Sequence, residues 1–307
     1  MLPRLKMSEP AGLRIFAPAK INLFLRVNGK RQDGYHELQT WMHKISLGDQ
    51  LVLELSGPGI ELECEGEQVP GNEDNLAFRA AGLFLDRTDK KKSAGVRIRL
   101  AKNIPVSAGL GGGSSDAGAV LKGLNKLFGQ PLSACELLEL ALELGADVPF
   151  FTADYDAVWA TGVGEKMVPL PPLPETSLVL VNPGISVATK WVFENFVLTE
   201  NSQESTVPCP SEMAGSALDM MVNDLEAVTA NRYPVIGEIK DALLEAGAKH
   251  VLMSGSGPTV FSLFPDDDEK GCFQVEDAVR VMRLRFDKVY KAKTIAGAWP
   301  SGQGTGF

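Results

Sequence analysis

The residues best suited to chemistry are a run of glycines directly before a pair of serines. Four glycines between residues 109 and 113 precede Ser114 and Ser115. Glycine has no Cβ atom, so its backbone can approach a phosphate chain closely, and the first turn of a following helix favours negative charge. A flexible loop with a serine N-cap fits the same spacing equally well. The segment therefore predicts either a phosphate-binding loop or a plain helix start.

Three other polar residues are candidates for a functional site. Lys20 and Asn22 lie two residues apart in a strand-like run, so their side chains share one face. Asp147 stands between a predicted helix end at Gly145 and the apolar run 148–151, which we predict to be a strand. This position allows a carboxylate to be partly buried next to a substrate. On local grounds alone, Lys20 is more typical of a solvated side chain, and a structural cap is the competing interpretation of Asp147.

Two loops supply further candidates. The turn signal at residues 33–34 is followed by Tyr35 and His36, an aromatic ring and an imidazole that can bond the edge of a nucleobase. Gly255 and Gly257 lie between two predicted strands, where they permit a close backbone approach to a ligand. A plain strand-to-strand turn explains these two glycines at least as well.

Composition and missing motifs exclude several classes of protein. The formal net charge of −9 over 307 residues disfavours a general surface for nucleic acid. The sequence contains neither of the two common phosphate-loop patterns, nor the His-Arg-Asp and Asp-Phe-Gly signatures of protein kinases. The four cysteines are far apart and form no C-x-x-C pair, so no zinc site or disulfide framework is indicated. Without a signal peptide or an apolar span, we expect a cytoplasmic protein that does not enter the membrane.

These residues require a mixture of helices and strands to position them. Apolar periodicity predicts helices at 114–128, 133–144, 218–230 and 235–246. The helix at 133–144 has a capping box formed by Ser133 and Glu136. Shorter apolar runs predict strands at 14–16 continuing through 21–27, and at 51–55, 96–100, 178–181, 251–253, 260–264 and 288–295.

The predicted elements divide into two domains of an α+β protein. The segment 162–165, together with the prolines between residues 169 and 174, looks like a connection between two packed units. We therefore predict an N-terminal domain at 1–163 and a C-terminal domain at 164–307, with the final strand as a candidate to return to the first domain. The segment 199–216 is rich in Ser, Glu and Pro and is predicted to be a surface loop.

The glycine segment resembles the ATP-binding motif of the GHMP kinase superfamily, Pro-x-x-x-Gly-Leu-Gly-Ser-Ser-Ala. Two additional glycines before the serine pair match the 4-diphosphocytidyl-2-C-methyl-D-erythritol kinase branch, although Ser107 and Ala108 stand where some members have glycines. The resemblance runs from Pro18 to about Phe264 with the motifs in the expected order. It assigns the binding of ATP to Pro105, Val106, Ser107, Ala108, Gly109, Leu110, Gly111, Gly112, Gly113, Ser114 and Ser115.

The resemblance also implies a fold and a reaction. It implies a two-domain GHMP-kinase fold, whose N-terminal domain resembles the ribosomal protein S5 domain 2-like fold with a left-handed β-α-β crossover. The active-site cleft is expected between the domains. The implied reaction is phosphorylation of the 2-hydroxyl of 4-diphosphocytidyl-2-C-methyl-D-erythritol by ATP and Mg²⁺, in the non-mevalonate isoprenoid pathway. No metal ligand is assigned.

Carried over residue by residue, the resemblance gives roles to the candidates above. Lys20 holds the acceptor hydroxyl in line, and Asp147 is the general base. Tyr35 stacks on cytosine while His36 hydrogen-bonds it. The remaining substrate contacts are Asn22, Thr189, Phe193, Gly255 and Gly257, although a simple core position explains Phe193 about as well.

Two alternatives remain open at this point. A mevalonate- or homoserine-type kinase shares the glycine loop but not the Tyr35–His36 pair. A nucleotide-binding regulator without activity shares the fold, but the presence of both Lys20 and Asp147 argues against it. We expect the protein to be a monomer or a weak homodimer.

Overall fold

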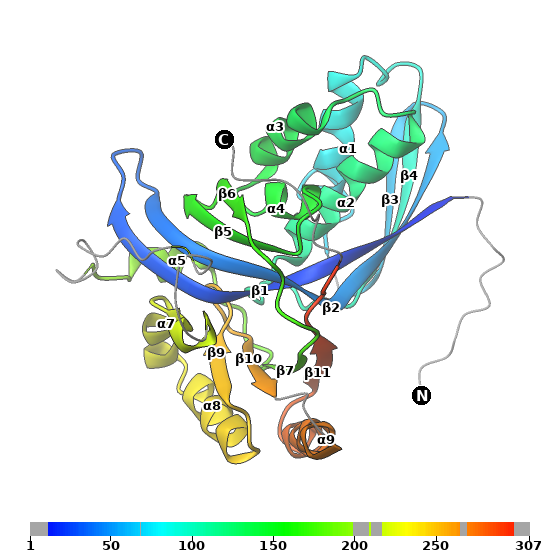
Figure 1. The fold of residues 1–307 in the computed structure, drawn as a ribbon. Helices are drawn as coiled ribbons and strands as arrows, with labels where there is room; N and C mark the ends of the chain where they lie inside the picture. The colour runs from blue at the N-terminus through cyan, green and yellow to red at the C-terminus, as the bar shows by residue number, and fades with distance from the viewer. Residues whose placement is uncertain (1–11, 68, 199–208, 210–216, 265–268, 298–307) are drawn as a thin grey trace. The chain divides into compact units, whose positions relative to one another are not determined.

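The computed structural model describes residues 12–67, 69–198, 209, 217–264 and 269–297 (Figure 1). Its contacts divide the chain into two compact units. The first unit comprises Met1–Ala17, Gly48–Asn103 and Gly113–Ala153, and the second comprises Pro18–Leu47, Ile104–Gly112 and Asp154–Phe307. Helices and strands are mixed in both units, which confirms the α+β prediction. Both units are discontinuous along the sequence, and the domain boundary between residues 163 and 164 stays a prediction.

The sheet of the first unit combines parallel and antiparallel pairing. Strand β3 (Gly59–Gly66) runs parallel to β4 (Gly95–Lys102), and β4 pairs antiparallel with the last part of β2 (His36–Ser56). Parallel neighbours need a crossover connection, and helix α1 (Leu76–Arg87) supplies it here. The handedness of this crossover stays a prediction.

Helices complete the core of the first unit. They are α1, α2 (Gly112–Leu127), α3 (Ala134–Leu144) and the short α4 (Val148–Thr152). Their apolar faces pack on buried side chains of β2 and β4, for example Leu53 and Ile98. The predicted capping box is present, with the Ser133 hydroxyl accepting from the Glu136 N–H and the Glu136 carboxylate accepting from the Ser133 N–H.

The second unit contains two sheets. In the first, the part of β1 (Leu13–Lys30) in this unit lies between β2 and the short β8 (Val222–Asn223), while β5 (Ala157–Gly162) joins β2 to β6 (Lys166–Pro169). The other sheet has the order β11-β7-β10-β9, with every pair antiparallel. Its strands are β7 (Ser177–Asn182), β9 (His250–Met253), β10 (Val260–Phe264) and β11 (Lys288–Lys293).

Short helices follow the strands of the second unit. Helices α8 (Val235–Glu245) and α9 (Glu269–Arg283) pack on the four-stranded sheet, as Figure 1 shows. Helices α5 (Thr189–Glu194) and α7 (Glu226–Arg232) surround a smaller apolar cluster that includes Leu25 and Val192. A 3-10 helix spans Ala217–Met220.

Two predicted elements differ from the structure, one entirely and one in part. Residues 148–152 form helix α4 and not a strand, because Pro149 occupies a first-turn position where no backbone N–H is needed. The helix predicted at 218–230 is interrupted by β8, since the Asn223 side chain accepts from the Leu225 N–H and so competes with helical hydrogen bonding.

Two expectations about connections can be compared with the structure. Residues 162–165 form the turn of the β5–β6 hairpin, with the Gly164 N–H donating to Thr161 O at 3.2 Å, and this hairpin lies within the second unit. The last strand, β11, pairs with β7. Apart from Cys209, the predicted loop 199–216 lies outside the described residues. Within the described part of the chain, no helix is both long and apolar enough to cross a membrane.

Candidate functional site

Lys20 on strand β1 belongs to a series of hydrogen bonds between buried polar side chains, called here the polar chain. Lys20, Asn22 and Thr40 are 4%, 3% and 3% exposed. The Lys20 ammonium donates to Asn22 Oδ1, the Asn22 amide donates to Thr40 Oγ1 at 2.8 Å, and that hydroxyl donates to Phe24 O at 2.7 Å. Lysine is almost never fully buried without partners. Its burial here argues against the solvated side chain that the sequence alone favours.

Two glycine loops meet beside this polar chain: the first glycine loop, through its residues 109–112, and the second glycine loop, residues 255–257, both of which lie in the second unit. The Lys20 N–H donates to Leu110 O at 3.0 Å. The Ser254 hydroxyl accepts from the Asn22 N–H at 3.3 Å and donates to Gly109 O at 2.9 Å. A Cβ atom at Gly255 would lie 3.3 Å from Asn22 Oδ1 and 3.4 Å from Lys20 Nζ. The structure therefore brings together Lys20, Asn22, the 109–110 segment and Gly255.

The first glycine loop is a tight turn that contains three residues of positive φ. Ser107, Gly109 and Gly111 have φ values of 53°, 75° and 70°. Helix α2 begins at Gly112, two residues earlier than predicted, so residues 112–115 supply the first-turn N–H groups that lack helical acceptors. Ser107 holds a left-handed backbone conformation that glycine adopts more easily. Some members of the resembled family have glycine near this position, so the serine here carries a backbone strain that a glycine would avoid.

The remaining loop positions divide by exposure. Val106 is exposed, Ser114 is half-buried, and Ser115 is buried in the core-facing side of α2. Pro105, Ala108 and Leu110 are buried and anchor the loop to the core. The Ser114 side chain is therefore more accessible than that of Ser115.

Asp147 is the residue that precedes helix α4. Its backbone lies at φ −83° and ψ −16°, and its side chain makes no capping hydrogen bond to that helix. The residue is half-buried. The structural-cap alternative therefore loses its main support. Asp147 belongs to the first unit and Lys20 to the second, and their pairing stays a prediction.

An aromatic pair marks the expected base site. The His36 ring stacks on Phe193, with centroids 5.1 Å apart and an interplanar angle of 24°. Burial, followed by the nearby positive charge of Lys30, lowers the pKa of His36 below its ordinary value, so the imidazole is neutral at pH 7. Tyr35 is 66% exposed and directly precedes β2, where its carbonyl accepts from the Arg31 N–H at 2.7 Å. The His36 ring therefore covers one face of Phe193.

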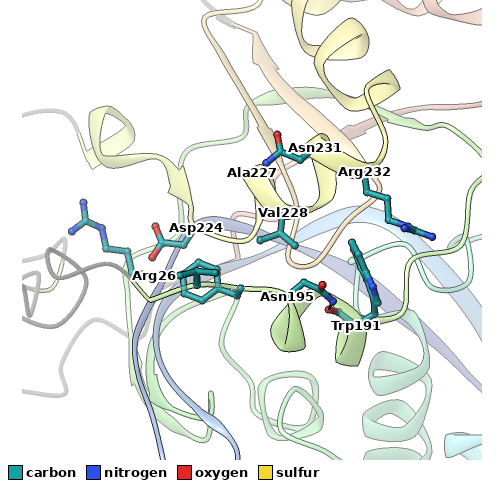
Figure 2. A pocket seen from close by; sticks show the side chains of 10 residues that line it. Arg26, Trp191, Asn195, Asp224, Ala227, Val228, Asn231 and Arg232 are labelled. Carbon is teal, nitrogen blue, oxygen red and sulfur yellow. Dashed lines mark hydrogen bonds between the residues drawn. The ribbon is translucent and has the colours of Figure 1, made fainter.

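Helix α5 connects this base site with the second glycine loop. The Thr189 hydroxyl lies 2.9 Å from Ser256 Oγ. On the same helix, Trp191 faces a groove of about 770 Å³, which Asn195 also lines and whose other wall is α7 (Figure 2). The Arg232 guanidinium lies 5.0 Å from the centre of the Trp191 ring. Helix α5 thus places Thr189 beside Ser256, Phe193 beside His36, and Trp191 at a separate groove.

Several buried polar residues that support the site are not identified by the sequence patterns. Asn223 donates to Met253 O and Gly255 O at 2.7 Å each, and Thr229 donates to Ser256 O at 3.2 Å. Both residues interrupt an apolar helical pattern, which is the available signal. The pattern alone does not reveal that their partners lie about thirty residues further along the chain.

A second feature that the patterns do not identify is an ionic triad in the first unit. The Lys102 ammonium donates to Asp49 and, at 2.8 Å, to Asp116 Oδ2, and all three side chains are almost fully buried. Burial is the largest influence on Asp116 and raises the pKa of its carboxyl to about 8. Lys102 and Asp116 flank the glycine loop in sequence, so the triad ties the end of β4 to the first turns of α2.

Comparisons with known proteins agree with this geometry. The sequence matches the GHMP kinases N terminal domain at residues 75–154 and the GHMP kinases C terminal domain at 200–280. A solved structure titled 4-(cytidine 5'-diphospho)-2C-methyl-D-erythritol kinase has 36% identity and a TM-score of 0.78, over 93% of this chain and 100% of that chain. A homoserine kinase from Cytophaga hutchinsonii has 20% identity and a TM-score of 0.66, over 95% of this chain and 98% of that one, which shows a shared fold.

Curated relatives narrow the family. A 4-diphosphocytidyl-2-C-methyl-D-erythritol kinase from Syntrophotalea carbinolica is 48% identical over 82% of this chain and 89% of its own length. The kinase of the same name from Desulfotalea psychrophila is 45% identical over 92% of this chain and 95% of its own length. From this identity over more than four fifths of each chain, it follows that the protein belongs to the 4-diphosphocytidyl-2-C-methyl-D-erythritol kinase family of GHMP kinases.

Proposed function

We propose that this protein transfers the γ-phosphoryl group of ATP to the 2-hydroxyl of 4-diphosphocytidyl-2-C-methyl-D-erythritol, a step of the non-mevalonate isoprenoid pathway. ATP as the co-substrate follows from membership of the GHMP kinases. The observation that carries the proposal is the buried Lys20–Asn22 pair, held against two glycine loops of the second unit. Two loops and a buried cation form an arrangement suited to phosphoryl transfer, which depends mainly on positioning and on charge stabilisation.

In the proposed mechanism, the backbone N–H groups of residues 109–115 bind the phosphates of ATP. Lys20 orients the acceptor hydroxyl and offsets the negative charge that develops during transfer. Its hydrogen bond to Asn22, and the further bond from Asn22 to Thr40, fix the lysine rotamer before substrate arrives. Asp147 takes the proton of the hydroxyl as that oxygen attacks the γ-phosphorus.

Recognition of the cytidine group is assigned to the aromatic pair and its neighbours. Tyr35 and Phe193 supply rings that stack on a pyrimidine. His36 is neutral at pH 7 because its pKa is lowered, so it offers one donor and one acceptor to the base edge. The exposed position of Tyr35 allows its ring to close over a bound base. Thr189 and the glycines at 255 and 257 complete the proposed substrate contacts.

Mg²⁺ is proposed to accompany ATP. The ion prefers oxygen ligands and is usually held by substrate phosphates together with one or two protein oxygens. The half-buried Ser114 hydroxyl at the start of α2 is an oxygen of this kind, beside the proposed phosphate loop. When bound, the ion would neutralise charge on the phosphates. We also propose a cytoplasmic protein that acts on a small molecule as a monomer or weak homodimer, without binding nucleic acid.

The test is ADP release by purified protein with ATP and Mg²⁺, with three alcohols offered in parallel. Turnover with 4-diphosphocytidyl-2-C-methyl-D-erythritol alone is the expected result. Turnover restricted to mevalonate or homoserine would keep the kinase chemistry and discard the base site. ATP binding without turnover of any of the three alcohols would contradict the proposal and favour a nucleotide-binding regulator.

A further inference from the structure

The second glycine loop is held in an unusual backbone shape by side chains from elsewhere in the second unit. Gly255 and Gly257 both adopt positive φ values, 56° and 81°. Residues 253–256 are buried, and their carbonyl oxygens need donors because an unpaired buried carbonyl is costly. The identity of those donors determines where the loop lies relative to Lys20.

Asn223 supplies two of these donors from one side chain. Its amide nitrogen donates to Met253 O and to Gly255 O at 2.7 Å each, and its Oδ1 accepts from the Leu225 N–H at 3.0 Å. The residue is 6% exposed, and both the nitrogen and the oxygen of the amide are used. Aspartate has no donor and serine has one, so neither can hold both carbonyls at this position.

Neighbouring residues hold the same loop. Thr229, which is fully buried, donates to Ser256 O at 3.2 Å. The Glu226 carboxylate accepts from the Met253 N–H at 2.8 Å. The segment from β8 to α7, residues 222–232, therefore holds residues 253–256 through several hydrogen bonds.

The start of the same segment, residues 222–224, is bonded to β1, the strand that carries Lys20. Strand β8 pairs in parallel with β1, with Asn223 aligned to Leu25. The next residue, Asp224, donates its N–H to Leu25 O at 3.0 Å, and its carboxylate accepts from the Val27 N–H at 2.9 Å. Asn223 thus joins β1 to the glycine loop, and a Cβ atom at Gly255 would lie within 3.4 Å of both Asn22 Oδ1 and Lys20 Nζ.

We propose that Asn223, supported by Thr229, is a positioning residue for phosphoryl transfer. It sets the separation between the Gly255 loop and the Lys20–Asn22 pair, and it acts through these groups without touching substrate. The inference rests on the proposed role of Lys20. A displacement of about 1 Å in a reacting group lowers kcat by about a hundredfold. The KM for ATP should change less, because the proposed ATP contacts lie on the other glycine loop.

The test compares Asn223→Ser, Asn223→Ala and Thr229→Val with the wild type, measuring kcat, both KM values and thermal unfolding. We expect kcat to fall with each donor lost, by about tenfold for Asn223→Ser and about a hundredfold for Asn223→Ala. KM for ATP should stay within about threefold. Thr229→Val preserves shape and removes one donor, so kcat should fall by about threefold to tenfold.

Asn125→Ala is the matched control. Asn125 is also buried, and its amide also makes two backbone hydrogen bonds, both to Leu132 at 3.0 Å in the first unit. Its loss should lower the unfolding temperature and leave kcat unchanged. If the Asn223 variants lower stability as Asn125→Ala does and keep wild-type kcat, the inference is overturned. Should they fail to fold, wild-type kcat in Thr229→Val overturns it equally.

The outcomes separate this inference from the proposed function. If the wild type phosphorylates mevalonate or homoserine instead of the cytidine compound, the proposed substrate is wrong, and the same variants are compared with the alcohol that reacts. If the wild type turns over no alcohol, both the function and the positioning role are contradicted.

Discussion

At the scale of single residues, Asp147 carries the most specific chemical proposal. Replacement by Asn preserves size and removes the base, so turnover should fall by about a hundredfold to ten-thousandfold. ATP affinity should change by less than about twofold, because the proposed phosphate contacts are made by the glycine loop. Steady-state kinetics together with ATP titration measure the two effects, and the exposed Asp154→Asn variant is the control. Equal losses in turnover and ATP affinity would rule out a role as general base.

His36 leads to a prediction about pH. Its pKa is lowered by burial and by Lys30, so the neutral imidazole persists to a more acidic pH than the ordinary value of about 6.5. KM for the cytidine substrate should be constant above about pH 6.5 and should rise as the pH falls through the lowered pKa. His36→Gln, which keeps one donor and one acceptor without titrating, should remove this rise. A KM that rises equally with acid in both proteins would show that another group titrates.

At the scale of elements, the contact between the two glycine loops can be tested at Gly109. Its φ is 75°, and a Cβ atom there would lie 2.1 Å from Ser254 O. Gly109→Ala should therefore lower both stability and ATP-dependent turnover, the latter by at least about tenfold. Gly129→Ala is the control, since Gly129 has φ 78° but no atom lies within 4 Å of the position that a Cβ would take there.

Comparison of these two variants separates strain from collision. Both replace a glycine of positive φ, which costs about 1 kcal/mol in stability. Only Gly109→Ala forces the two loops apart. Urea unfolding should show a loss of stability in both variants, larger in Gly109→Ala because of the added collision. ADP release should fall in Gly109→Ala alone. Full turnover in Gly109→Ala would mean that the loop contact does not matter to the reaction.

The elements also show what can be predicted from the sequence. Both ends of helix α3 are predicted correctly because Ser133, Glu136 and Gly145 are local signals that act within one turn. The helix predicted at 218–230 is confirmed only from residue 226, because Asn223 bonds to carbonyls about thirty residues away and its side chain interrupts the helical pattern. Local periodicity cannot report such a long-range partner. The family resemblance, in contrast, identifies candidate site residues, but it does not predict which residues contact them.

At the scale of the whole molecule, the burial of charged side chains is the property that is hardest to predict from the sequence. Lys20 has the local pattern of a solvated residue, yet it is 4% exposed because loops around residues 110 and 255 cover it. Lys102 lies at the end of an ordinary strand, yet its two acidic partners come from β2 and α2. In both cases, the environment is created by segments distant in sequence, so only the fold reveals it.

The Lys102 triad predicts how stability of the molecule depends on pH. The folded Asp116 carboxyl has a pKa of about 8, raised from 3.8, so the folded state holds this proton more tightly than the unfolded state does. Its contribution to stability is present below about pH 4 and is lost as the pH rises through about 8. Lys102 also has a raised pKa, because the two carboxylates outweigh its burial, and it acts in the same direction at higher pH. The neighbouring Cys64 thiol has a raised pKa, through burial and the charge of Asp116.

Asp116→Asn tests this dependence, because the amide keeps the shape of the side chain and stays neutral. Below about pH 4 the variant and the wild type should be similarly stable. From about pH 5 to about pH 8, the stability of the variant relative to the wild type should rise by roughly 1–3 kcal/mol, since only the wild type has a carboxyl that ionises in the unfolded state while it stays protonated in the folded state. Urea unfolding at both pH values measures this difference, with the surface variant Asp86→Asn as control. A constant difference across this range would mean that Asp116 is ionised throughout, and that the triad is two carboxylates sharing one lysine rather than an ion pair beside a neutral acid.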